Sequence, residues 1–169
     1  MTLTKNKYYF EALDNYPYNL PDCLEALNYA LSYDPEDADS LCLMGRIYSE
    51  ILIDYEKAKL YFEEAMQCNV TNLNTPKYYI KCLLDNEDFH EAQKLIEYSL
   101  NIKGIDKATI WFYRSLLSER RGSFANALKF LEKAEKYCFS QYSRDVVKER
   151  RKFIKSKMPK KRKLKKETK

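Results

Sequence analysis

The sequence has few of the residues on which most catalytic sites depend. Its 169 residues include one histidine and three glycines. Nucleophilic catalysis usually needs a base beside a Ser, Cys or Thr, but His90 lies in the opening turn of an expected helix, where side chains normally face solvent. No two glycines are close enough to build a phosphate-binding loop. We therefore predict that the protein is not an enzyme, with no catalytic residues and no cofactor.

Closely spaced cysteine pairs are also absent. The five cysteines form no C-x-x-C pair, and His90 has no cysteine within seven residues. Structural zinc sites are normally built from such close-spaced ligand pairs. An odd number of cysteines without a secretory signal also argues against a disulfide framework. We predict no metal site, and cysteines that pack as small apolar side chains.

No stretch has the pattern of a strand, a signal sequence or a membrane span. Glycine and proline are scarce, at three and five residues, and no run alternates strictly between apolar and polar residues. This favours an all-α fold, and 45% hydrophobic residues suffice for the core of one domain. Because no long apolar run occurs, we expect no membrane insertion. We expect a cytoplasmic location, or a nuclear one if the organism is eukaryotic.

What the sequence does contain is a repeated pattern of large and small residues. In each copy a small residue follows an aromatic or aliphatic one by three positions, a bulky apolar residue follows after four, and a second small residue after three more. These steps place four side chains on one stripe of an α-helix, with room for a neighbouring helix at the small residues. The copies are Tyr55, Ala58, Phe62 and Ala65; Phe89, Ala92, Ile96 and Ser99; Phe124, Ala127, Leu131 and Ala134; and, more weakly, Leu20, Cys23, Leu27 and Ala30.

The period of this pattern indicates a helical repeat array. The first small residue recurs at positions 23, 58, 92 and 127, so the spacings are 35, 34 and 35 residues. With this period and pattern the chain resembles the tetratricopeptide repeat (TPR) family. The first helices fit the family more loosely, through Leu41, Met44, Gly45 and Tyr48 in one unit and Trp111 with Ser115 in another, whereas Pro76 departs from it. The resemblance implies a helix-turn-helix array, a TPR-like α-solenoid of about four units.

The repeat pattern and the charge distribution divide the chain into three predicted segments. A TPR-like repeat domain is expected over residues 1–142, with units at about 4–37, 38–72, 73–107 and 108–141. Pro17 and Pro21 make the first unit degenerate. Apolar residues at helical spacing predict a capping helix over 143–158. Beyond Pro159 no apolar stripe remains, so residues 159–169 are expected to form a disordered basic tail.

The TPR resemblance also implies a function and a set of binding residues. TPR arrays hold an extended peptide or a partner helix on a concave face lined mainly by first helices. The chain is then a non-catalytic protein-interaction module, an adaptor or scaffold, whose basic residues favour an acidic partner. The carboxylate clamp known in the family needs paired asparagines, but Arg46 and Lys81 stand at those positions. The expected groove residues are Cys42, Leu43, Arg46, Glu50, Lys77, Tyr78, Lys81, Phe112 and Tyr113.

The charge distribution leaves two alternatives open. Residues 144–169 carry fourteen Lys or Arg against three acidic residues, a net charge of +11, although the whole chain nets only +5. Such asymmetry points to an anionic partner, and the alternative function is a nucleic-acid-associated factor. A small TPR-type chaperone of bacterial secretion is the other alternative. The sequence PKKRK also looks like a nuclear import signal. The residues expected to contact an anionic partner are Lys160, Lys161, Arg162, Lys163, Lys165 and Lys166.

Overall fold

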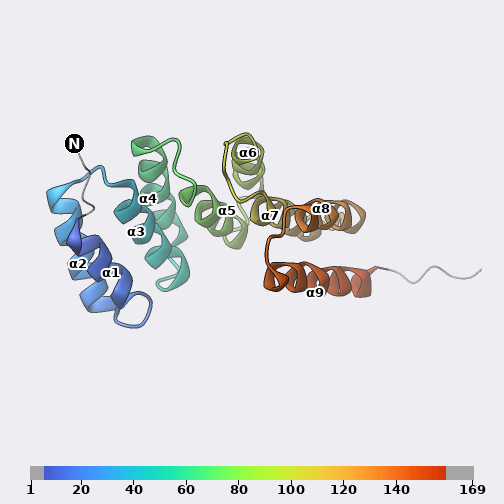
Figure 1. The fold of residues 1–169 in the computed structure, drawn as a ribbon, viewed down its shortest axis with the longest axis horizontal. Coiled ribbons are helices and arrows are strands. Elements are labelled where there is room, and N and C mark those ends of the chain that lie inside the picture. The colour runs from blue at the N-terminus through green and yellow to red at the C-terminus, as the bar shows by residue number, and fades with distance from the viewer. Residues whose placement is uncertain (1–5, 159–169) are drawn as a thin grey trace, which may run out of the picture. The chain divides into compact units, whose positions relative to one another are not determined.

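The structure is a computed structural model in which residues 6–158 are described. Within this range the chain forms nine α-helices and no strand, as the all-α prediction requires. The helices group into two compact units, which divide between Asp106 and Lys107. The chain can be followed helix by helix in Figure 1.

The N-terminal unit consists of three helical hairpins. In each hairpin a short turn joins two consecutive helices that pack against each other, and each hairpin also contacts the next one. The hairpins are α1 with α2, α3 with α4, and α5 with α6 (Figure 1). The helix bounds are Lys7–Asn15 (α1), Leu20–Tyr33 (α2), Ala38–Glu50 (α3), Tyr55–Cys68 (α4), Thr75–Asp85 (α5) and Phe89–Ser99 (α6).

Side chains just before the helices satisfy their first backbone N–H groups. The Asp37 carboxylate accepts a hydrogen bond of 3.2 Å from Ser40 N at the start of α3. Asp54 does the same for Lys57 N at 3.1 Å at the start of α4. The α5 helix is capped from further upstream, because the side-chain oxygen of Asn72 accepts from Thr75 N at 3.0 Å. These caps fix where the first and second helices of the hairpins begin.

Three turns between paired helices use the same backbone conformation. Ile53, Glu87 and Gly122 have φ values of 55°, 63° and 75°, each one residue before the N-cap of the following helix. Only Gly122 has the residue type that adopts this left-handed region without strain. The turn geometry is therefore a property of the repeat.

The repeated small residues lie in the core, which supports the packing role predicted for them. Ala58, Ala92 and Ala127 have no exposed surface, and the bulky residues four positions later are equally buried. In the second hairpin a glycine extends this close packing, because a Cβ atom at Gly45 would lie 2.8 Å from the Phe62 ring. The two helices of a hairpin thus approach each other closely where small residues, on either helix, face the partner helix.

The C-terminal unit contains α7 (Lys107–Arg120), α8 (Phe124–Lys136) and α9 (Gln141–Lys157). A core that includes Leu131, Val147 and Ile154 joins α8 to α9. Ion pairs add to this attachment, because both Arg150 and Lys157 reach the buried Glu119 of α7, at 2.7 and 2.9 Å. The helix α9 begins two residues before the expected start of the capping helix. The predicted boundaries of the repeat units and of this segment stay predictions.

Candidate protein-binding surfaces

The main cluster of groove residues in the N-terminal unit surrounds Arg46 of α3. Its guanidinium carbon lies 4.5 Å from the centre of the Tyr16 ring and 4.2 Å from the centre of the Tyr78 ring. Glu50, one helical turn further along α3, has a carboxylate oxygen 3.7 Å from Arg46 Nη2. We call Tyr16, Arg46, Glu50 and Tyr78 the Arg46 cluster. Three of its four members are residues that the sequence predicted for the groove.

Two aromatic rings hold the Arg46 side chain and leave part of its hydrogen-bonding capacity unused. Cation–π contact with a ring stabilises a guanidinium, more so when the contact excludes water. The Arg46 Nε atom is buried and has no hydrogen-bond partner among the described residues. The Tyr16 hydroxyl donates a hydrogen bond to the Glu50 carboxylate. Burial and this hydrogen bond raise the pKa of Tyr16, so its hydroxyl remains a donor at neutral pH.

Two lysines of α5 lie on the same helix as Tyr78. The Lys77 ammonium is 4.9 Å from the centre of the Tyr78 ring and donates a hydrogen bond of 3.1 Å to the Asn74 side chain. The Lys81 ammonium pairs with Asp85 at 2.9 Å, and its side chain is 44% exposed. Burial alone would lower the pKa of Lys81, but the hydrogen bond and charge of Asp85 outweigh it and the net shift is upward. Both ammonium groups are in reach of solvent, one helical turn apart.

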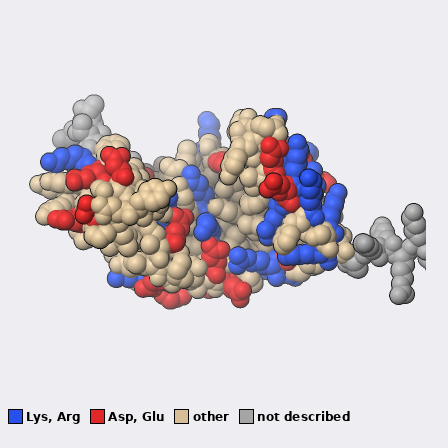
Figure 2. Space-filling model, turned by 90° about the horizontal axis from the view of Figure 1, so that it is seen from below, with Lys and Arg blue, Asp and Glu red and all other residues tan. Residues whose placement is uncertain are grey.

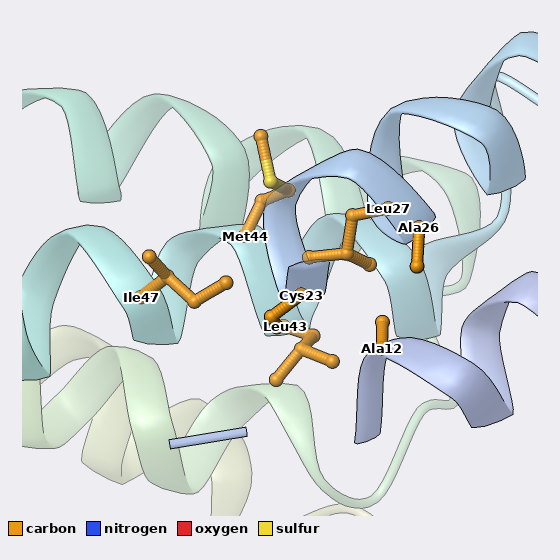
Figure 3. Close-up of a cluster of buried hydrophobic side chains, with 7 residues drawn as sticks. All are labelled: Ala12, Cys23, Ala26, Leu27, Leu43, Met44 and Ile47. Atoms are coloured by element: carbon orange, nitrogen blue, oxygen red, sulfur yellow. The ribbon is translucent and has the colours of Figure 1, made fainter. Parts of the chain in front are cut away.

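Cys42 and Leu43 are core residues and have almost no surface. Leu43 is 2% exposed and packs with Ala12, Cys23 and other side chains of α1, α2 and α3 (Figure 3). Cys42 is 4% exposed and packs against Phe62. Burial raises the pKa of Cys42 to about 11, which keeps the thiol protonated at neutral pH. We therefore leave both residues out of the proposed binding surface.

The remaining groove residues, Phe112 and Tyr113, lie on α7 in the C-terminal unit. Both are half-buried, and their ring centres are 6.4 Å apart. Phe112 lines an apolar pocket of about 160 Å³ between α7 and the start of α9. The pocket is lined by Ala108, Thr109, Phe112, Cys138, Tyr142, Ser143, Val146 and Val147.

The sequence analysis also made predictions about the basic tail, a metal site, a membrane-spanning helix and His90. The tail residues predicted to contact an anionic partner, Lys160 to Lys166, lie outside residues 6–158. Within that range, no group of three or more His, Cys, Asp or Glu is arranged to hold a metal ion. The same residues include no helix with the length and apolar character needed to cross a membrane. His90 is exposed at the start of α6.

Sequence reasoning missed Tyr16, which completes the Arg46 cluster. Tyr16 directly follows α1 as its C-cap, in the unit that was expected to be degenerate. Its contact with Glu50 spans 34 positions of the sequence. The TPR pattern contains no position for such a residue, because it comes from a turn and not from the face of a first helix. No local signal in the sequence could have identified it.

Comparison with known proteins identifies the fold. No family model matches the chain, and no curated protein matches its sequence. Two solved structures match over 89% of this chain: PilF of Pseudomonas aeruginosa and MamA of RS-1, the latter as a double mutant. The TM-scores are 0.75 and 0.65, the sequence identities 17% and 14%, and the matches cover 70% of PilF and 88% of MamA. The chain therefore has the α-solenoid fold of tetratricopeptide repeat proteins, as its repeat pattern predicts.

Proposed function

We propose that the chain is a non-catalytic protein-interaction module that holds an acidic peptide or helix on the surface formed by the Arg46 cluster, Lys77 and Lys81. TPR-like folds commonly serve as interaction scaffolds, which supports the general class. The single observation that carries the proposal is Arg46 itself, a cation held between two rings with a buried Nε that has no partner among residues 6–158.

The chemistry of this surface favours a carboxylate ligand. A guanidinium presents a planar fork of donors that matches a carboxylate, and contact with two rings restrains it before the ligand arrives. Because Tyr16 and Tyr78 restrain Arg46, less side-chain entropy is lost on binding. Lys77 and Lys81 add two cations on α5, whereas the nearby acidic groups, Glu50 and Asp85, are already paired. An acidic segment of a partner would meet net positive charge here.

Peptide selection on the immobilised full-length chain tests this function. A random peptide display library should yield sequences enriched in Asp and Glu, and the enriched peptide then serves as the probe in a fluorescence anisotropy titration. The double variant Lys77→Glu/Lys81→Glu should weaken its binding by roughly 10-fold or more, because the reversed charges repel the peptide. The loss of stability should be small, since partly exposed charges contribute about 1 kcal/mol or less, and circular dichroism confirms that the variant is folded.

A matched control separates this surface from net charge alone. Lys94 and Lys103 are exposed lysines of the same unit, away from the Arg46 cluster in sequence. Lys94→Glu/Lys103→Glu introduces the same charge change and should reduce binding much less. Arg46→Lys keeps the charge but loses the planar fork, so it should also weaken binding. If the two double variants bind the peptide equally well, the proposed surface is wrong.

A further inference from the structure

The outer face of α9 carries a row of basic residues that the proposed function does not use. Arg144, Lys148, Lys152 and Lys155 are all exposed and follow one another at steps of four, four and three. These steps place the four side chains on one face of the helix, over a length of about 16 Å at 1.5 Å per residue. We call them the α9 stripe. Figure 2 shows basic side chains gathered over the part of the C-terminal unit next to the C-terminal residues drawn in grey.

The other three paired basic residues of α9 form ion pairs within the C-terminal unit, which distinguishes them from the α9 stripe. Arg150 and Lys157 pair with the buried Glu119, and Arg151 pairs with Glu135 at 2.6 Å, so these three attach the helix to α7 and α8. By helical spacing Arg150 and Lys157 lie on the opposite side of α9 from the stripe, whereas Arg151 lies beside it, seven residues after Arg144. The side chains of Lys152 and Lys155 make no hydrogen bond or ion pair with any other residue in the range 6–158.

The two N-terminal members of the stripe have only weak contacts. Arg144 donates a long hydrogen bond of 3.5 Å to the Cys138 carbonyl. Lys148 lies 3.8 Å from the Asp145 carboxylate, which already accepts a hydrogen bond of 2.8 Å from Gln141. Exposed pairs at such distances contribute little to stability. The charge of the stripe is therefore available to a ligand.

We propose that the α9 stripe binds the phosphate backbone of a nucleic acid without reading its sequence. A duplex carries one negative charge per about 1.7 Å of its axis, so phosphates are available along the whole length of the stripe. Binding would come from the release of counterions from those phosphates, and lysine and arginine contacts to phosphates carry no base specificity. This function goes beyond the interaction module and does not depend on it.

The surroundings of the stripe favour phosphates over the two other anionic partners. A membrane-surface helix needs a continuous exposed apolar face. On α9 the apolar residues Val147 and Ile154 are buried against the unit, and the exposed aromatic side chains, Tyr142 and Phe153, are eleven residues apart. A protein partner gains affinity by burying apolar contact area at the centre of an interface. Asp145, Glu149 and Ser156, next to the stripe, are polar. The half-exposed Phe153 lies beside Arg150 and Lys157, whose cationic groups are 5.1 and 4.2 Å from the centre of its ring. A contact made by charge alone suits a phosphate backbone.

The test compares two four-residue variants of the full-length chain by their salt dependence. The stripe variant replaces Arg144, Lys148, Lys152 and Lys155 by Gln; the control variant replaces the exposed Lys94, Lys103, Lys129 and Lys136 by Gln. A short labelled DNA duplex of random sequence is the probe, titrated between about 50 and 200 mM salt. Both variants lose the same charge, and circular dichroism confirms that each is folded.

The expected result is a flatter salt dependence in the stripe variant alone. Four lost phosphate contacts should reduce the slope of log affinity against log salt by about 3 to 4, a factor of roughly 100 in affinity over this salt range. The control variant should keep the slope of the unmodified chain, and a second duplex of different sequence should bind equally well. Equal slopes for the two variants would overturn the proposal.

Two further experiments test whether the tail, and not the stripe, holds the nucleic acid, and whether the stripe prefers another anion to the duplex. The stripe effect should persist when the six basic residues between 160 and 166 are also changed to Gln; if it disappears, the tail alone holds the nucleic acid. Vesicles of phosphatidylserine and a poly-glutamate peptide should compete poorly with the duplex at equal charge. Stripe-dependent binding of either competitor that exceeds duplex binding would overturn the assignment to nucleic acid.

Discussion

The small residues of the repeat determine how closely paired helices approach. Ala127 has no exposed surface, whereas Ala125, two residues earlier on α8, is exposed. Ala127→Leu should therefore overpack the contact and lower the free energy of unfolding by about 1 to 3 kcal/mol. Ala125→Leu should change it by no more than about 0.5 kcal/mol. Chemical denaturation followed by circular dichroism measures both, and equal midpoints would refute the packing register.

The left-handed turn residues provide a second test at the residue scale. Ile53 adopts a φ of 55° and is β-branched, a combination that is strained by about 1 to 2 kcal/mol relative to glycine. Ile53→Gly removes this strain and adds backbone entropy to the unfolded chain, with a net gain in stability of about 0.5 to 1 kcal/mol. The neighbouring Leu52 is exposed and does not have a positive φ. Leu52→Gly should destabilise the protein, and stabilisation by both variants would contradict the explanation.

The burial of single residues shows which of them the sequence could place correctly in the core or on the surface. The repeat residues were predictable because their type and spacing are set by helix packing, and they are buried as expected. Cys42 and Leu43 were placed in the groove by their position in the repeat. Their burial depends on neighbours far away in the sequence, such as Ala12 of α1 for Leu43. A repeat pattern describes one hairpin, and cannot specify what covers its outer residues.

The attachment of α9 is the main feature at the scale of elements. Glu119 has a side chain that is only 3% exposed, and two cations of α9 neutralise it. Buried charges are stable only when they are paired, and hydrogen bonds between charged groups contribute about 1.5 to 3 kcal/mol each. Together with Val147 and Ile154, Glu119 holds α9 in a defined orientation. That orientation leaves the α9 stripe exposed.

Glu119→Gln should loosen α9 while the rest of the chain remains folded. The amide cannot neutralise Arg150 and Lys157, but both are partly exposed and water can solvate them, so the loss should be about 1 to 3 kcal/mol. Amide hydrogen exchange in α9 should accelerate more than in α3 or α4. The exposed Glu132 of α8 provides the control, since Glu132→Gln should leave exchange in α9 unchanged. Equal protection of α9 in both variants would show that Glu119 does not attach it.

The sequence predicted some elements better than others for a physical reason. The helices α4, α6 and α8 carry a regular stripe of large and small residues, which is a signal contained within one helix. The Arg46 cluster combines α3 and α5 with the end of α1, and Tyr16 has no counterpart in the pattern. The sequence also could not show which basic residues of α9 form ion pairs within the unit and which remain exposed. It depends on where Glu119 and Glu135 lie after folding.

At the scale of the whole molecule, the fold alone does not identify a partner. PilF and MamA are only 17% and 14% identical in sequence to this chain. Their likeness to it therefore concerns the backbone arrangement alone. Function has to be argued from the surface chemistry. In the N-terminal unit that chemistry is a guanidinium in contact with two tyrosine rings, and in the C-terminal unit it is an exposed basic helix face.

Chemical-shift mapping with the selected acidic peptide tests the central claim most directly. The peptide should shift backbone amides of α3 and α5, with the largest changes around Arg46, Lys77 and Tyr78, because the ligand replaces water at the guanidinium and alters the ring contacts. The N–H signals of the Arg46 guanidinium should move as the solvent-accessible part of the group gains an acceptor. Amides of α6, which packs against α5 but contributes no residue to the cluster, should change less. Shifts confined to other helices, with Arg46 unperturbed at saturation, would contradict the account.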